Sequence, residues 1–283
     1  MARELRTRKA NRAPLALHFD FITMKKCTRF SIGILALALI LIVIRTQARA
    51  DDAGFVWAYA LHDSYSNDTF YSADFTKPFG PSAPIRPYAE LLLQRDSQTT
   101  TGVLPQTFND NYGLAAAGMQ LETNSGLRFF AQIGTSFDFG PAIQDLPTSS
   151  HFDGRGGVQY DREWNVPPSG ANRYFGTFFG DFVYYSRYRN GLMYFEAERG
   201  REFGSRTYPL QIYVRLSGSQ DTQREYYNDA IALAGGAGFL VLGRHGPSVG
   251  FTESFNSYTT AVPYGVLRSY WSFRPQITYG ASF

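Results

Sequence analysis

The residues able to do chemistry in this chain are mostly charged side chains, with few histidines among them. After residue 50 the sequence contains three histidines, His62, His151 and His245, and none stands in a spacing that suggests a Ser-His-acid triad. His62 precedes Asp63 and two serines, which suggests a weak hydrolytic site, although a solvated loop explains this grouping equally well. We therefore expect no catalytic residues and a protein that is not an enzyme.

Patterns that would hold a cofactor are missing from the sequence as well. There is no HExxH motif, no phosphate-binding P-loop and no cysteine cluster. We therefore expect no metal site and no other cofactor.

Charged side chains and tyrosines instead alternate with apolar residues along segments of strand length. Residues 210–217 and 267–283 show this period of two most clearly, which is typical of strands with one apolar and one polar face. In a membrane barrel the polar face lines the interior, because an arginine that faces lipid costs about 2–4 kcal/mol. The residues that we expect to line this interior are Glu90, Glu122, Arg128, Asp181, Glu196, Glu198, Tyr213, Arg215, Arg268, Tyr270 and Arg274.

These side chains require an all-β fold, and the sequence predicts an antiparallel transmembrane barrel of about twelve strands. A parse with ten strands, which omits the first two, is also possible. Either even count allows both ends of the barrel to lie in the periplasm. Asn124-Ser125-Gly126 and Arg189-Asn190-Gly191 predict hairpin turns in which glycine supplies a positive φ. The expected strands span 54–62, 68–77, 87–98, 111–123, 126–138, 154–164, 172–187, 191–202, 207–219, 229–242, 246–257 and 265–283.

The last strand carries an apolar and aromatic face that resembles the insertion signal of outer-membrane barrels. This face predicts outer-membrane lipid and the barrel-assembly machinery as partners. A soluble β-sandwich would also alternate, but charges would then occupy its core. Glu253 falls on the apparently lipid-facing side of its strand, which leaves the register there open. The residues of the expected insertion face are Trp271, Phe273, Ile277, Tyr279 and Phe283.

The segment before residue 51 has the layout of a secretory signal. Lys25, Lys26 and Arg29 precede the apolar run 31–44, which is too short to span a bilayer comfortably. We expect an upstream extension at 1–23, a signal peptide at 24–50 and an outer-membrane barrel domain at 51–283, with an uncleaved N-terminal anchor as the alternative.

Removal of the first 50 residues reverses the sign of the net charge. That segment holds 10 of the 27 Lys and Arg but 2 of the 24 Asp and Glu, so the remainder has 17 basic and 22 acidic residues, a net charge of −5. The remainder is therefore not basic, and we expect no nucleic-acid partner.

Several short phrases of the sequence form a recognisable set. They are Arg86-Pro87-Tyr88 before Arg95-Asp96, Asn109-Asp110-Asn111-Tyr112 with Gly118, Gly180-Asp181 with Tyr184, and Asp221 with Tyr226-Tyr227-Asn228 and Gly236-x-Gly238. Together they resemble the C-terminal barrel region of the phage adsorption protein A (NfrA) family over most of 70–283. The resemblance implies an outer-membrane protein that is linked to exopolysaccharide production or export and is used by phages as a receptor. The family carries a long periplasmic helical-repeat region before its barrel, and roles that depend on that scaffold are not implied here.

Three functions follow as predictions. The first is a non-enzymatic outer-membrane barrel that supports exopolysaccharide export or assembly, or acts as a surface or phage receptor, with polysaccharide or its synthesis and export proteins as partners. The second is a narrow channel for small charged solutes or oligosaccharides. The third is an outer-membrane enzyme that modifies lipid, with its site near His62. In the first two, the interior charges either pair and seal the barrel or line a passage.

Overall fold

The computed structural model describes residues 54–80, 83–97, 111–138, 150–165, 173–204, 208–240 and 247–282. Twelve strands are found in these residues, as the sequence predicts. Their bounds are β1 Phe55–Asp63, β2 Asp68–Pro78, β3 Ile85–Asp96, β4 Tyr112–Glu122, β5 Leu127–Asp138, β6 Ser150–Asn165, β7 Arg173–Tyr185, β8 Asn190–Gly204, β9 Pro209–Asp221, β10 Ala230–Leu240, β11 Pro247–Tyr258 and β12 Ser269–Ser282.

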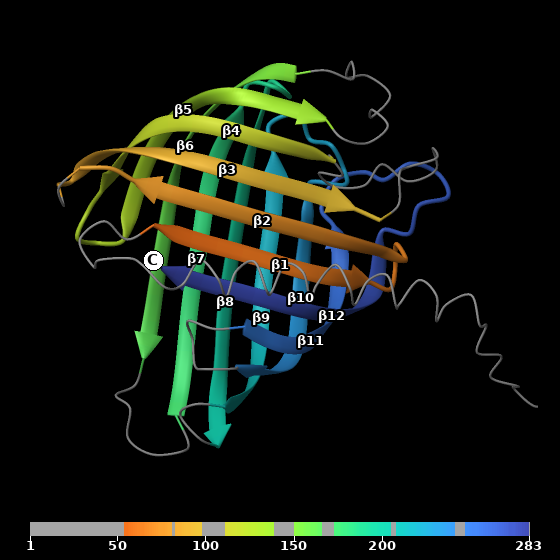
Figure 1. Ribbon diagram of the computed structural model, residues 1–283. Coiled ribbons are helices and arrows are strands. Elements are labelled where there is room, and N and C mark those ends of the chain that lie inside the picture. Colours follow the sequence, from red (N-terminus) through yellow and green to blue (C-terminus); the bar gives the residue numbers. More distant parts are fainter. Residues whose placement is uncertain are drawn as a thin grey trace, which may run out of the picture. The chain divides into compact units, whose positions relative to one another are not determined.

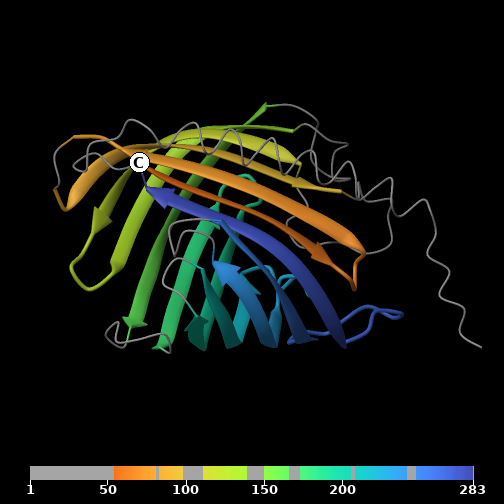
Figure 2. The same cartoon turned by 60° about the horizontal axis from the view of Figure 1, so that its bottom comes forward.

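The twelve strands form one closed antiparallel sheet. Each strand pairs with the next one along the chain, and β1 closes the ring by pairing with β12 from Phe55 opposite Ser282 to Leu61 opposite Gln276. Figures 1 and 2 show the strands following one another around the wall in chain order. The prediction of an all-β barrel with twelve strands is therefore confirmed, and the parse with ten strands is excluded.

The two ends of the barrel are named by the strand termini that meet there. The base is the end where β1 begins at Phe55 and β12 ends at Ser282, and the mouth is the end where β1 stops at Asp63 and β12 begins at Ser269. Because neighbouring strands are antiparallel, every odd-numbered strand runs from base to mouth.

The outer face of the barrel is apolar and largely exposed. Residues that are partners across two strands lie on the same face of the sheet. An outward-facing residue on one strand therefore identifies its partner on the next strand as outward-facing too. Ile133, Val214 and Trp271 face outward with 66%, 60% and 64% of their surface exposed. Such exposure of large apolar side chains, repeated from strand to strand, is unlike a water-facing surface.

Details of three predicted elements are corrected by the structure. The strand expected at 154–164 begins earlier, at Ser150, and the one expected at 265–283 begins later, at Ser269. The turn expected at 189–191 is displaced toward 186–189, because Asn190 and Gly191 already belong to β8 and the positive φ, 50°, falls on Arg189. The 124–126 turn is confirmed, with Gly126 at a φ of 91°.

Glu253 lies on the outer face of β11, where the sequence alternation puts it. Its register partners are Gly235 of β10 and Phe273 of β12, and Phe273 is exposed on that face. The alternation of inward and outward side chains along β11 is therefore unbroken at Glu253.

Some predictions fall on residues that the structure does not describe. These are the extension 1–23, the signal peptide 24–50, His245 and the terminal Phe283. Within the described part of the chain, no helix is long and apolar enough to cross a membrane.

Candidate functional site

The interior of the barrel is polar, as the alternation predicts. Ten of the eleven expected lining residues are in strands and share register with other inward-facing side chains. Tyr270 and Arg274 of β12, for example, are opposite Asn256 and Thr252 of β11, both of them buried. Arg268 differs, because it precedes β12 and is exposed in the loop at the mouth. The other inward-facing members of the expected set are Glu90, Glu122, Arg128, Asp181, Glu196, Glu198, Tyr213 and Arg215.

Three of the expected interior residues, Arg215, Glu196 and Glu198, form one ion-paired group. The Arg215 guanidinium contacts Glu198 Oε2 at 2.7 Å and Glu196 Oε1 at 3.3 Å, across the β8–β9 pair. Tyr194 donates a hydrogen bond of 2.7 Å to the other oxygen of Glu196. The side chains of Arg215 and Glu196 remain 25% and 24% exposed, so this group is paired and yet reachable from the interior.

The interior ion pairs follow the wall rather than crossing it. Six ion pairs between described residues each join two neighbouring strands or lie within one strand. Arg86 of β3 pairs with Glu122 of β4, and Arg173 of β7 pairs with Glu202 of β8. None of these six ion pairs therefore bridges opposite sides of the barrel.

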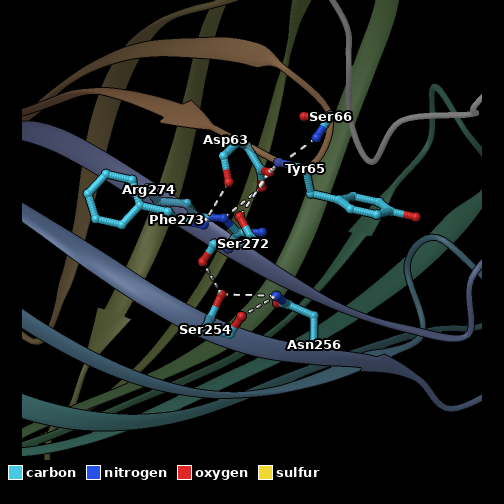
Figure 3. Close-up of polar contacts among 9 residues, drawn as sticks. Asp63, Tyr65, Ser66, Ser254, Asn256, Ser272, Phe273 and Arg274 are labelled. Atoms are coloured by element: carbon cyan, nitrogen blue, oxygen red, sulfur yellow. Dashed lines mark hydrogen bonds and ion pairs between the residues drawn. The ribbon is translucent and has the colours of Figure 1, made fainter. Parts of the chain in front are cut away.

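A second polar group closes the seam between the first and last strands at the mouth (Figure 3). Asp63 ends β1 and accepts hydrogen bonds from Arg274 Nε at 2.7 Å and Ser272 Oγ at 2.9 Å, both from β12. Its Oδ1 also accepts a bond of 2.8 Å from the backbone N–H of Tyr65, which shapes the following turn. Asp63 thus fixes both the seam and the loop that follows it.

Five tyrosines form a continuous row along one side of the mouth, the tyrosine row. Tyr65 stacks on Tyr270 with ring centroids 3.7 Å apart, and Tyr258 lies 5.7 Å from Tyr270. Tyr226 contacts Tyr258 edge-on at 5.4 Å and Tyr227 at 5.4 Å. The row draws on the loops after β1 and β9 and on β11 and β12, so the barrel closure assembles it from distant parts of the chain.

Buried polar contacts hold the loop that supplies Tyr226 and Tyr227. Asp221, at the end of β9, accepts hydrogen bonds from Asn190 Nδ2 at 2.8 Å and Asn228 Nδ2 at 2.6 Å. Asp229 accepts one of 2.9 Å from the backbone N–H of Asp221. All four of these polar side chains are at most 8% exposed, so the loop is firmly attached to the β7–β8 hairpin.

The two loop tyrosines keep their phenolic protons. Burial, reinforced by the negative charge of Glu225, raises the pKa of Tyr227 to about 12, and burial also raises the pKa of Tyr226. Both hydroxyl groups therefore remain neutral hydrogen-bond donors at physiological pH.

An arginine–tyrosine cluster lies on the other side of the mouth. Arg155 donates a hydrogen bond of 3.0 Å to the hydroxyl of Tyr112, and its guanidinium lies 5.1 Å from the ring centre of Tyr185. Arg187 lies over Tyr112 and Tyr188 at 5.0 and 5.5 Å, which are cation–π distances. Since β6 and β7 are six strands from β12 and β1 in the ring, this cluster lies across the mouth from Tyr65 and Tyr270. The other end of the row, in the loop after β9, lies beside the β7–β8 hairpin.

The interior is filled unevenly. On the β3–β4 side, Leu92, Tyr112 and Leu114 form a small buried core. On the β10 side the inner face is built of alanine and glycine, and Tyr213 lies against Gly236 with its hydroxyl 2.9 Å from Thr252. The Tyr213 ring is only 7% exposed, so it lies along the wall instead of projecting inward for stacking.

Several residues of the mouth were not among the sequence candidates. Asp153 and Arg155 belong to a stretch of β6 with a period of two that extends to Gln159, and this signal was present in the sequence. Tyr65 and Tyr258 lie at a turn and at a strand end, where no periodic signal exists.

The histidines occupy separate places in the described part of the chain. His62 shares a hydrogen bond of 3.0 Å with Thr69 Oγ1 and lies on the face of β1 opposite to Asp63. His151 is in β6 opposite Ser136. Within the described residues, no group of three or more His, Asp or Glu is arranged to hold a metal ion.

These features define the class of protein. A closed barrel with an even number of antiparallel strands, an exposed apolar outer face rich in aromatics and a charged interior is a transmembrane β-barrel of the bacterial outer membrane. In such a barrel the first strand begins and the last strand ends at the periplasmic side. The base, where β1 begins and β12 ends, is therefore periplasmic, and the mouth is extracellular.

Comparisons with known proteins give no family assignment. No family model matches the chain, and no curated protein matches it. The β-domain of the Bordetella autotransporter BrkA is 13% identical, with 81% of this chain and 99% of that chain covered at a TM-score of 0.41. An outer-membrane channel from Pseudomonas putida F1 is 11% identical, with 84% and 98% covered at a TM-score of 0.41.

A further solved structure, LpxR from Salmonella typhimurium, is 9% identical, with 80% of this chain and 99% of that chain covered at a TM-score of 0.40. At these identities and TM-scores the similarity assigns no function to the chain. The class stated above rests on the barrel's own closure and faces.

Proposed function

We propose that this chain is a non-enzymatic outer-membrane barrel that binds carbohydrate at the cell surface and so supports the export or assembly of an exopolysaccharide. The observation that carries the proposal is the tyrosine row at the extracellular mouth. Aromatic rings offer apolar faces for sugar rings, and tyrosine adds a hydroxyl for hydrogen bonding. Five such side chains in contact give a surface several sugar units long.

The surroundings of the row support a polymer ligand rather than a single sugar. In the arginine–tyrosine cluster, Arg155 is buried and paired with Asp153, whereas Arg187 and Tyr188 are half-buried at the mouth. A chain that passes along the tyrosine row would find stacking faces there and one cationic and one aromatic group at Arg187 and Tyr188. Polysaccharide and the proteins that make or export it are thus the proposed partners, beside outer-membrane lipid and the barrel-assembly machinery.

A receptor role follows from the same position. The row and its supporting loops lie at the extracellular end, where a phage would also engage the protein. This part of the proposal rests on the resemblance to the phage adsorption family and on the exposed loop position of Arg268 and Tyr264.

A narrow channel is the second candidate, and one observation favours it. The ion pairs join neighbouring strands, and the inner face of β10 carries only alanine and glycine from Ala230 to Gly238, so no large side chain of β10 projects into the interior beside the Arg215 group. Small charged solutes or oligosaccharides would pass there.

The test of the carbohydrate proposal is binding of defined acidic and neutral oligosaccharides to the refolded barrel, measured by calorimetry. Tyr65→Ala and Tyr270→Ala should each weaken binding about tenfold or more, since each removes a stacking face. Tyr264→Ala is the matched control, because Tyr264 is fully exposed in the same mouth and lies outside the row.

Equal affinity in all variants, or no binding by the wild type, would refute the carbohydrate proposal. Turnover of lipid substrates that is lost in His62→Ala would refute its non-enzymatic part.

A further inference from the structure

Three arginines on the outer face of the barrel near its base have no carboxylate partner among the described residues. Arg199 is in register with Val214, and Arg201 with Ile212, and both partners are exposed on the outer face. Arg162 of β6, two strands away, points to the same face. Arg162, Arg199 and Arg201 are called the outer arginine cluster.

Aromatic rings hold two of these guanidinium groups against the wall. Arg162 lies 5.7 Å from the ring centre of Trp164, and Arg201 lies 5.1 Å from those of Tyr174 and Phe203. The Nε atom of Arg201 is buried and has no hydrogen-bond partner in the described structure. Arg162 and Arg201 are therefore held by aromatic rings, and the Nε donor of Arg201 is left unused.

A groove of about 590 Å³ adjoins Arg199 on this face. Small side chains make it possible, because Gly176 and Ala197 are neighbours of Trp164 and Leu216 in the register. Its walls are apolar toward the middle of the barrel and cationic toward the base. The residues that give it this character are Trp164, Tyr174, Phe178, Arg199, Leu216 and Leu233.

A lipid-facing arginine is costly in the hydrocarbon region and much less so near the interface, where it can reach headgroups. On β8 the outward residues change from Phe195 and Ala197 to Arg199 and Arg201, which marks the periplasmic interface of the membrane. Guanidinium groups bind phosphate with paired hydrogen bonds, and no protein carboxylate occupies them in the described structure. The positive charge of the arginines thus suits an anionic headgroup, and the apolar groove suits an acyl chain of the same molecule.

We propose that the groove and the outer arginine cluster bind an anionic glycerophospholipid of the periplasmic leaflet. Its phosphate lies among Arg162, Arg199 and Arg201, and one acyl chain lies along the groove over Gly176 and Ala197. The site lies outside the barrel, so its failure would leave the carbohydrate proposal untouched.

The test is native mass spectrometry of the refolded full barrel, incubated with equal amounts of phosphatidylglycerol and phosphatidylcholine. The wild type should retain one phosphatidylglycerol at collision energies that strip the remaining lipid. Arg199→Gln combined with Arg201→Gln should lower the affinity for it about tenfold or more, since each basic side chain near the membrane surface contributes to anionic lipid binding.

Two further variants distinguish the effect of the groove volume from a general effect of outward-facing arginines. Gly176→Leu should also lower retention, because it fills the groove while the nearest atoms, Trp164 Cε3 and Glu198 O, lie 3.5 and 3.6 Å from the new Cβ. Arg95→Gln is the matched control, because Arg95 is an exposed outward arginine at the extracellular end of β3. Equal retention of the two lipids by the wild type, unchanged retention in the double variant, or an equal loss in Arg95→Gln would overturn the proposal.

Discussion

Asp63 connects residues that are more than two hundred positions apart in the chain. Its carboxylate receives Arg274 and Ser272 of the last strand and the backbone of the turn that carries Tyr65. The side chain of Asp63 is 8% exposed and that of Arg274 is 32% exposed. Loss of the carboxylate leaves these donors without their acceptor at the closing seam.

We expect Asp63→Ala to lower the free energy of unfolding by about 1–3 kcal/mol, the cost of leaving buried donors unsatisfied. Urea unfolding of the barrel in lipid vesicles measures this. Arg268→Ala, at an exposed loop residue, should stay within about 0.5 kcal/mol of the wild type. Similar values for the two variants would show that the seam does not depend on Asp63.

At the scale of one element, β10 shows how the two faces of a strand constrain glycine differently. Gly236 faces inward, and a Cβ there would lie 2.4 Å from Tyr213 Cζ. Gly235 faces outward, and a Cβ there would have no neighbour within 4 Å. The inner glycine is therefore needed for close packing and the outer one is not.

Gly236→Ala should destabilise the barrel by about 1–2 kcal/mol, because Tyr213 must move away from Thr252 and lose its hydrogen bond. Gly235→Ala should be neutral or stabilise it by about 0.4–1 kcal/mol through a less flexible unfolded chain. Thermal or urea unfolding of the two variants gives the signs, and equal signs would contradict the assigned faces.

The sequence alone was enough to locate the strands but not to place their ends and turns. A period of two identified the twelve strands and the inward direction of Glu198 and Arg215, because alternation is a local property. It misplaced the β7–β8 turn, since glycine at position 191 suggested a positive φ that the structure gives to Arg189. The tyrosine row was out of reach, because Tyr65 and Tyr226 meet Tyr258 and Tyr270 only when the sheet closes.

For the molecule as a whole, the question is whether the charged interior conducts. Arg215 is held by two glutamates on one wall, and its register partner on β10 is the small residue Ala234. Which part of the interior is filled depends on side-chain packing around the ring, as with Leu92 and Leu114, and alternation does not encode this.

If the barrel conducts, Arg215→Ala should make the current more selective for cations, because Glu196 and Glu198 would lose their counter-charge. Single-channel recording in planar bilayers under a salt gradient measures the reversal potential. Arg268→Ala, outside the strands at the mouth, should leave the potential unchanged. A silent bilayer with correctly folded protein would remove the channel candidate and favour a sealed interior.

The central claim is a membrane barrel whose last strand shows one face to lipid and the other to an aqueous interior. Single cysteines placed along 270–274 test it directly, after replacement of Cys27, the one cysteine in the sequence. In reconstituted vesicles, cysteines at Tyr270 and Arg274, which are half-buried on the inner face, should react with a water-soluble thiol reagent. Those at Trp271 and Phe273 should be protected from it, and a lipid-borne quencher should reach a probe attached there. Uniform labelling without a period of two would contradict the account.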